Sequence, residues 1–180
     1  PFGLHFSTYA PDLPGFHGSE RPNDWYRIED FSEGLTTYMD ALGIERAHVV
    51  GQHGGALIAF DLAARHPGRV TKLVLNGCPC WTREEGRRYH ETAWLPKQCT
   101  ERGFMPPRKL EDVKKLISNA DEATVELWDK GRADKGWVLI SHTGMSEYDV
   151  PSKLSQIRAP TLLLYGDNEA AHLLQGQKTL

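Results

Sequence analysis

A short apolar segment that ends at a turn bracketed by glycines constrains the fold of this chain more than any other feature. Residues 47–50 have the composition of a buried strand, and residues 56–64 form a largely apolar stretch with the length of a helix. The turn between them, residues 51–55, reads Gly-Gln-His-Gly-Gly. Its small residues let a strand and a helix approach closely, so the central residue, His53, is expected in a strained backbone conformation. This is the geometry of a nucleophile elbow, in which amides at the helix start can stabilise an anion.

The segments on either side of this turn alternate between strand and helix patterns. Residues 6–10 and 70–75 have the composition of strands, and apolar residues recur at helical spacing over residues 28–42. Acidic residues suit the start of that helix, and Gly43 suits its end. A further apolar run at 159–165 predicts another strand. Alternating strands and helices connect through right-handed crossovers, so the sequence predicts an α/β fold with a parallel sheet.

Residues 81–150 have a different composition, which is rich in charge and in tryptophan. Helices are expected near residues 110–117, 123–128 and 136–140, and no strand is expected in this segment. A helical stretch placed between two strands of a parallel sheet predicts an insertion above the edge of the sheet.

Taken in order, these segments resemble the α/β-hydrolase superfamily over most of the chain. The matching parts are the loop after the fourth strand (11–19), the next helix and fifth strand (28–50), the following turn and sixth strand (66–75), the cap (81–150) and the seventh strand (157–166). In the loop, His17-Gly18 inverts the more usual Gly-His order. The resemblance implies an incomplete α/β-hydrolase fold, which is a parallel sheet with crossover helices, plus a helical cap insertion.

The resemblance also divides the chain. It implies that residues 1–80 are the first part of the hydrolase core, residues 81–150 the helical cap insertion, and residues 151–180 the core around the seventh strand. The chain would start at about the fourth strand and stop before an eighth, so we expect a fragment of a longer hydrolase. The oxyanion-hole His-Gly segment and the distal triad histidine of the superfamily would then both lie outside it.

The resemblance assigns catalytic positions to three residues. Members of the superfamily usually carry serine, cysteine or aspartate at the elbow centre, where this chain has His53, and the backbone amide of Gly54 would supply half of an oxyanion hole. The acid after the seventh strand matches Glu169, with Asp167 as a neighbouring alternative. Imidazole is partly neutral near pH 7, so His53 could attack an activated acyl or phosphoryl group, or act as a general base on water.

A substrate pocket is expected between the cap and the sheet, because ligand sites lie outside the carboxyl ends of the strands. The tryptophans of the segment 81–150 could line this pocket, or they could equally be core residues of the cap. His172 lies only three residues beyond Glu169, too near to be the triad histidine, and is read as a surface residue. The residues predicted to bind substrate are Gln52, Trp81, Trp94 and Trp137.

Composition limits the partners of the chain. The formal net charge is −3, with acidic and basic residues intermixed, which argues against a nucleic-acid surface and against a polybasic membrane patch. No apolar run approaches the roughly 20 residues needed to span a bilayer. Three cysteines are better read as reduced thiols of a cytoplasmic protein than as a disulfide framework. The histidines show no metal-ligand spacing, so we expect no metal and no cofactor, and the oligomeric state stays open.

Three hypotheses on function remain from the sequence. The first is a hydrolase of a small apolar ester, lactone, epoxide or halide, with a small-molecule substrate as its partner. The second is a non-catalytic ligand-binding pseudoenzyme on the same fold. The third is an inactive fragment of a longer hydrolase.

Overall fold

A parallel sheet of three strands forms the base of the computed structural model, which describes residues 2–100, 103–115, 117–130, 135–167 and 169. The strands are β1 (Ala47–Gln52), β2 (Val70–Asn76) and β5 (Thr161–Leu164), in the order β1-β2-β5. All pairs are parallel, with Val49 beside Leu73 and Leu73 beside Thr161. The predicted α/β fold with a parallel sheet is confirmed.

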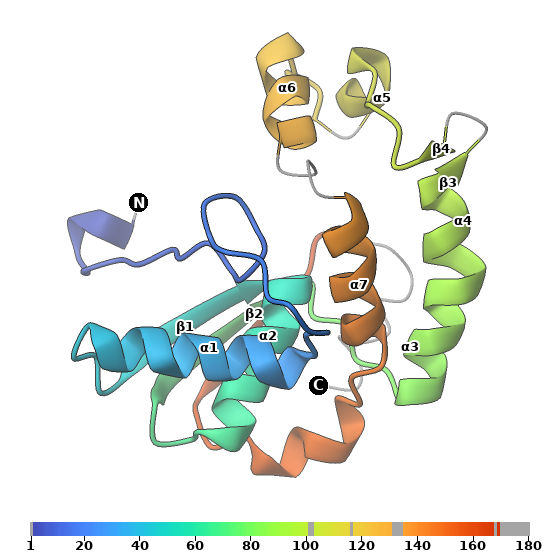
Figure 1. Ribbon diagram of the computed structural model, residues 1–180. Helices are drawn as coiled ribbons and strands as arrows, with labels where there is room; N and C mark the ends of the chain where they lie inside the picture. Colours follow the sequence, from blue (N-terminus) through green and yellow to red (C-terminus); the bar gives the residue numbers. More distant parts are fainter. Residues whose placement is uncertain (1, 101–102, 116, 131–134, 168, 170–180) are drawn as a thin grey trace.

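Two helices cover one face of this sheet (Figure 1). Helix α2 (Gly54–Arg65) lies against β1 and β2, and every residue from Ala56 to Ala64 is buried, as the apolar sequence predicts. Helix α1 (Ile28–Ala41) packs on α2 and places the ring of Phe31 in the core. The opposite face is partly open, because the side chains of Val50, Leu162 and Leu164 are 58, 55 and 44% exposed.

Helix α1 begins and ends where its sequence predicts. The backbone N–H of Arg27 donates to the carboxylate of Asp30 at 2.7 Å, which satisfies a donor next to the first turn. Gly43 follows the helix with a φ of +67°, a left-handed conformation that suits glycine.

The strand predicted at residues 6–10 is wrong. These residues run as irregular chain after a short 3₁₀ turn, η1 (Phe2–Leu4), and the side chains of Phe6 and Tyr9 are more than half exposed. Strand propensity describes a fit to a pleated and half-buried surface. No described strand pairs with this segment, so its aromatic residues alone do not make it one.

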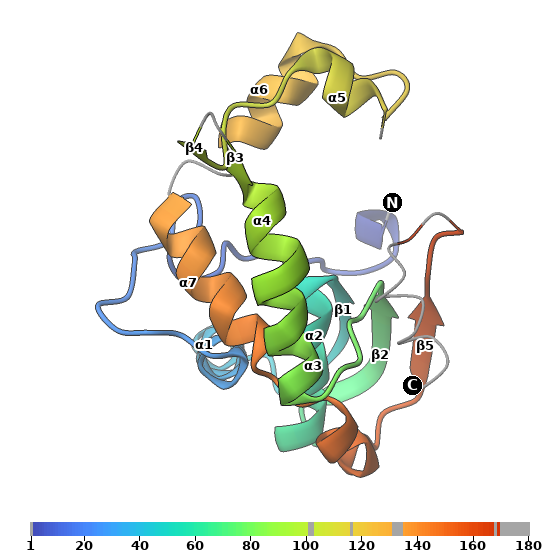
Figure 2. The same cartoon turned by 90° about the vertical axis from the view of Figure 1, so that its right-hand side faces the viewer.

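The segment between β2 and η3 (Pro151–Gln156) is mainly helical. Helix α3 (Arg83–Tyr89), a π-helical turn η2 (His90–Trp94) and helix α4 (Leu95–Gln98) follow one another as a single rod (Figure 2). Helix α7 (Lys135–Ser146) lies beside this rod, while α5 (Leu110–Lys114) and α6 (Glu122–Lys130) lie further from the sheet. Helices at the three predicted places are confirmed, and we call residues 81–150 the helical insertion.

A short hairpin and the helical rod over residues 83–98 are features of the insertion that were not predicted. A minimal antiparallel hairpin joins β3 (Cys99–Thr100) to β4 (Gly103–Phe104), so the expectation of no strand is wrong. Helix α3 was missed although its start has a reciprocal capping box. Thr82 Oγ1 accepts the N–H of Glu85 at 3.3 Å, and the Glu85 carboxylate accepts the N–H of Thr82 at 2.8 Å. The Thr-x-x-Glu spacing is a sequence signal for such a start.

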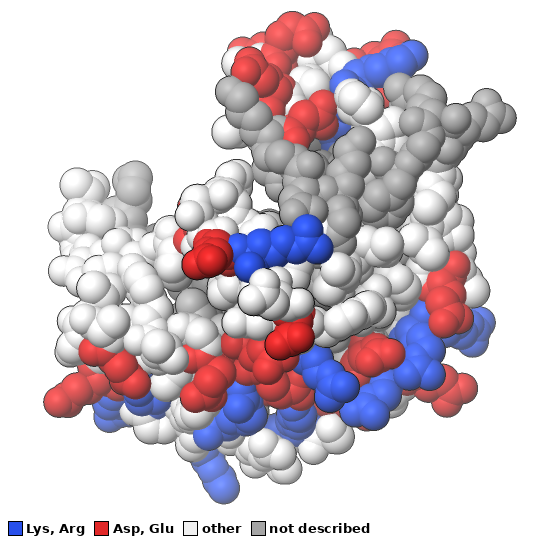
Figure 3. Space-filling model, in the orientation of Figure 1, with Lys and Arg blue, Asp and Glu red and all other residues white. Residues whose placement is uncertain are grey.

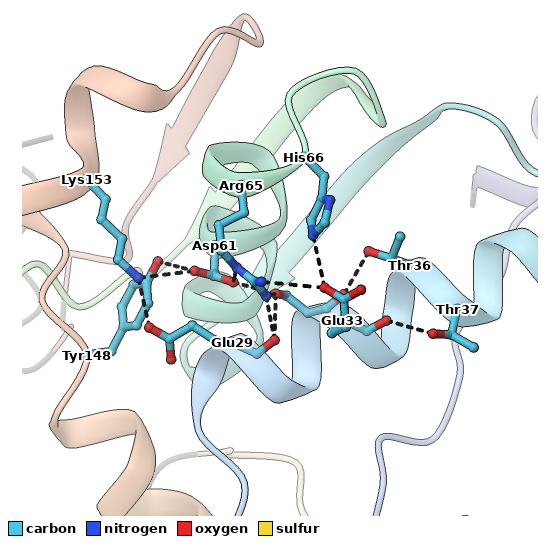
Figure 4. A network of polar contacts seen from close by, with 10 residues as sticks. Glu29, Glu33, Thr36, Thr37, Asp61, Arg65, His66, Tyr148 and Lys153 are labelled. Atoms are coloured by element: carbon cyan, nitrogen blue, oxygen red, sulfur yellow. Dashed lines mark hydrogen bonds and ion pairs between the residues drawn. The ribbon is translucent and has the colours of Figure 1, made fainter.

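A buried carboxylate joins the insertion's return to the two core helices (Figure 4). Asp61 on α2 is fully buried and accepts hydrogen bonds from the Ser32 hydroxyl, from Arg65 Nε at 2.7 Å and from Tyr148 Oη at 2.8 Å. Lys153 Nζ on η3 lies 3.3 Å from the same carboxylate. Burial by itself raises the pKa of Asp61, but the hydrogen bonds from Ser32, Arg65 and Tyr148 outweigh it and hold that pKa below its usual range.

Surface charge is mixed in sign. On the face shown in Figure 3, acidic and basic side chains alternate over the lower part of the molecule. Within the described part of the chain, no helix has both the length and the apolar character needed to cross a bilayer. Cys78, Cys80 and Cys99 are free thiols, the first two of them buried.

Candidate active site

The backbone of the Gly-x-His-x-Gly turn has the strained geometry that its sequence predicts. His53 stands between β1 and α2 with φ 48° and ψ −115°, a region that residues with a side chain rarely occupy. Its N–H donates to the carbonyl of Asn76 at the end of β2, at 2.9 Å. A Cβ at Gly51 would lie 2.3 Å from the carbonyl oxygen of Gly55, so the strand and helix cross too closely for any side chain at residue 51.

The elbow histidine contacts the predicted acid directly. His53 Nε2 lies 3.1 Å from Glu169 Oε1, and the two side chains are 52 and 19% exposed. Glu169 reaches this place through a turn after β5, in which its N–H donates to the carbonyl of Gly166 at 3.1 Å. The structure therefore brings together the two residues that the sequence assigned to the nucleophile and acid positions. Asp167, the alternative acid, is exposed in the same turn.

Gly77 lies against this pair, a place that no sequence pattern predicted. It follows β2 with a φ of +57°, and its N–H donates to the carbonyl of Leu164 at 2.8 Å. A Cβ at residue 77 would lie 2.5 Å from Cδ2 of His53 and 3.4 Å from Oε2 of Glu169. A glycine after a strand reads as an ordinary turn, so its position beside the site emerges only from the packing of β1, β2 and β5.

The start of α2 is covered by the helical insertion. Gly54 is the first residue of α2, where amides have no acceptor within the helix, as an oxyanion donor requires. A Cβ at Gly54 would lie 2.7 Å from Sδ of Met145 on α7. Met145 is thus the residue of the insertion placed against the elbow, and nothing in the local sequence distinguished it.

The four residues predicted to bind substrate lie in different surroundings. Gln52 is exposed at the end of β1, next to the elbow. Trp81 is 7% exposed and stacks on Tyr89, with ring centroids 5.4 Å apart. Trp94 is half-buried and stacks on His142, with centroids 3.7 Å apart. Their role in binding stays a prediction.

Trp137 is a core residue that also borders a surface pocket. Its side chain is 1% exposed and meets the ring of Phe31 edge to face, with centroids 6.4 Å apart. The pocket lies between Trp137, Ile140 and the loop 21–25, and its lining does not include His53 or Glu169. Trp137 therefore lines a pocket, but one that is separate from the elbow.

His172, predicted to be a surface residue, lies outside the described residues. His142 pairs with His90, the two Nδ1 atoms being 3.1 Å apart. Among the residues that the structure describes, no three histidine, cysteine, aspartate or glutamate side chains gather as metal ligands would.

Comparisons with known proteins agree with the fold. A family model described as an alpha/beta hydrolase fold matches residues 2–88. Over 69 residues, or 38% of this chain, the sequence is 46% identical to a 2-hydroxymuconate semialdehyde hydrolase of Pseudomonas putida, of which it covers 25%. Over 74 residues, or 41% of the chain, it is 42% identical to a haloalkane dehalogenase of Mesorhizobium japonicum, of which it covers 23%. The chain thus spans about a quarter of these relatives.

Similarity in structure extends over more of the chain. A hydrolase of Pseudomonas aeruginosa superposes with a TM-score of 0.67 at 22% identity, and the match covers 93% of this chain and 66% of that protein. At this identity the likeness concerns the fold. The matched region includes the helical insertion as well as the sheet, because the match covers 93% of this chain.

Proposed function

Because this chain belongs to the α/β-hydrolase superfamily, we propose that it hydrolyses a small apolar acyl compound, an ester or a lactone, with His53 and Glu169 as the reacting pair. The observation that carries the proposal is the 3.1 Å contact between a half-exposed imidazole at the elbow and a carboxylate from the turn after β5. A carboxylate that accepts a ring N–H orients an imidazole and stabilises its protonated form.

Imidazole chemistry favours acyl substrates over halides and epoxides. A ring nitrogen of His53 attacks the carbonyl carbon, the carbonyl electrons move to oxygen, and the tetrahedral intermediate expels the alcohol oxygen, which takes up a proton from water. The proton on the other ring nitrogen passes by way of Glu169 to the hydroxide that remains, which restores the water. The product is an acyl-imidazole, whose C–N bond water then breaks to release the carboxylic acid and the free ring. Displacement at a halide or epoxide carbon would instead leave an alkylated imidazole that water does not cleave.

The surroundings of the elbow support a small substrate. We propose that residues 81–150 act as a cap, since Met145 of α7 lies against Gly54 at the start of α2. The Gly54 amide would stabilise the oxyanion, and Gln52, Trp81 and Trp94 are proposed to contact the substrate, whereas the pocket beside Trp137 is separate from the elbow. The relatives named above act on small organic molecules, which supports a small-molecule partner. Three free thiols support a cytoplasmic location.

The test is hydrolysis of p-nitrophenyl butyrate by matched histidine variants. The chain contains a second His–Glu pair, His66 Nε2 and Glu33 Oε2 at 3.2 Å, at the far end of α2. General acid–base groups contribute about 10²–10⁴-fold, so we expect His53→Ala to lower the rate at least about tenfold and His66→Ala to leave it unchanged. Brief reaction and mass spectrometry should find one butyryl group on the peptide that carries His53.

Two outcomes would contradict the proposal. Equal rates for the parent, His53→Ala and His66→Ala would show that hydrolysis is the background of surface histidines. A folded, inactive chain that still binds small apolar ligands saturably would favour the ligand-binding pseudoenzyme instead.

A further inference from the structure

The two nitrogens of the His53 ring lie in different surroundings. Nε2 is 3.1 Å from Glu169 Oε1, a distance at which the ring N–H donates to the carboxylate. An imidazole that donates from Nε2 keeps its free electron pair on Nδ1 while it is neutral. The contact with Glu169 thus decides which nitrogen is available for reaction.

Gly77 faces the same edge of the ring as Glu169. A Cβ at residue 77 would lie 2.5 Å from Cδ2 and 2.8 Å from Nε2 of His53, and real Cβ contacts are not this short. Cδ2 and Nε2 are neighbours in the imidazole, and Nδ1 lies on the other side of the ring. Because Gly77 has no Cβ, the Nε2 edge of the ring has room to reach Glu169. Nδ1 then lies on the side of the ring that faces away from Gly77.

The backbone holds Gly77 firmly in this place. Its N–H donates to Leu164 O at 2.8 Å, two residues before Gly166, where the turn that carries Glu169 begins. The preceding residue, Asn76, accepts the N–H of His53 at 2.9 Å. Two main-chain hydrogen bonds thus join the ends of β1, β2 and β5: Gly77 makes one of them, and the residue before it makes the other. Gly77 therefore cannot move away from the ring independently of these strand ends.

We propose that Gly77 is the positioning residue of the pair: it seats the Nε2 edge of His53 on Glu169 and so makes Nδ1 the reacting nitrogen. Only the statement that Nδ1 attacks a substrate rests on the proposed function. The seating of the ring is a property of the folded chain and is measured without a substrate. A negative result in the esterase assay would therefore not contradict the seating of the ring. A negative result for the seating of the ring would likewise not contradict esterase activity.

The test is the site of alkylation on His53. Excess iodoacetamide alkylates accessible imidazoles irreversibly, and the Nδ1 and Nε2 products are separate, stable isomers that can be resolved after digestion. We expect the parent to give mainly the Nδ1 isomer at His53. In Gly77→Ala the new methyl group displaces the ring from Glu169, so the Nδ1 isomer should fall to a minority of the product.

A second glycine provides the matched control. Gly43 also has a positive φ, of +67°, but a Cβ there would meet no atom within 4 Å. Gly43→Ala therefore introduces the same kind of backbone strain without touching the ring, and should give the parent's ratio of isomers. Glu169→Ala, which removes the acceptor and adds no bulk at residue 77, should shift the ratio as Gly77→Ala does. Mainly Nε2 product in the parent, or the parent's ratio in either Gly77→Ala or Glu169→Ala, would overturn the proposal.

Discussion

His53 and Glu169 meet at 3.1 Å although 116 residues separate them in the chain. The first belongs to the turn after β1 and the second to the turn after β5, and β2 lies between the two strands. The pair thus depends on the three strands ending at one edge of the sheet. We therefore expect either residue of the pair to support hydrolysis only while the other is present, which leads to the first prediction.

His53→Ser should not produce an active serine hydrolase. The substitution places a hydroxyl at the elbow, but it also removes the imidazole, and serine needs an adjacent base to react. Restoring one member of a group that acts together recovers almost nothing. We expect His53→Ser and His53→Ala to have equally low rates on p-nitrophenyl butyrate. A clear gain for the serine variant over the alanine variant would mean that another base reaches the elbow.

The two glycines that bracket the elbow should differ sharply in their tolerance of alanine. A Cβ at Gly51 would lie 2.3 Å from a backbone oxygen, whereas a Cβ at Gly55 would meet no atom within 4 Å. Overpacking of this kind costs about 1–3 kcal/mol or more, so Gly51→Ala should lower the free energy of unfolding by at least that amount. Gly55→Ala should be neutral, or stabilising by up to about 1 kcal/mol, because alanine favours a helix. Urea unfolding of both variants measures the difference, and equal losses would contradict the close crossing at Gly51.

Removing the charge of Asp61 should destabilise the chain strongly. Asp61→Asn leaves Arg65 and Lys153 facing a neutral amide, and breaking a buried ion pair costs about 3–5 kcal/mol. Glu33→Gln is the control. Glu33 is an exposed partner of the same Arg65 at 3.5 Å, and its loss should cost no more than about 1 kcal/mol. Similar unfolding free energies for the two variants would show that the buried network contributes little.

Stability should fall in mild acid through His90. Burial lowers the pKa of His90, because its side chain is only 7% exposed and its Nδ1 lies 3.1 Å from Nδ1 of His142. The unfolded chain therefore binds a proton near pH 6.5, where native His90 does not yet do so. The free energy of unfolding should then decline as the pH falls below about 6.5 towards the lower pKa of the native state.

His90→Gln should remove this part of the pH dependence. The measurement is the unfolding free energy at a series of values between about pH 7 and pH 5, where the slope reports the difference in bound protons. His5→Gln, at an exposed histidine, is the control and should keep the parent's slope. An unchanged slope in His90→Gln would contradict the assignment.

The sequence was most informative where local chemistry and packing agree. The strands at β1, β2 and β5 and the helices α1 and α2 carry regular apolar patterns with clear ends, and all lie where they were expected. Residues 6–10 show the limit of such patterns, because a strand also needs a neighbour to accept its hydrogen bonds. Helix α3 shows an opposite limit: it lacks an apolar pattern, and the Thr82–Glu85 capping box was its main signal.

The candidate site was predicted in parts rather than as a whole. His53 and Glu169 could be placed on their turns from the sequence, but their contact depends on how three strands align. Gly77 and Met145 could not be found, because a glycine and a methionine carry no chemical label of their own. What matters at both positions is the space beside another residue, which only the folded chain defines.

The links that close the carboxyl edge of the sheet, from His53 N–H to Asn76 O and from Gly77 N–H to Leu164 O, use main-chain atoms alone. The location of residue 53 is therefore independent of the side chain it carries. A single codon change delivers a hydroxyl, a thiol, a carboxylate or an imidazole to the same spot, and the partner groups then decide whether it reacts. The shape of the backbone at this turn therefore identifies the reactive position whichever side chain stands there.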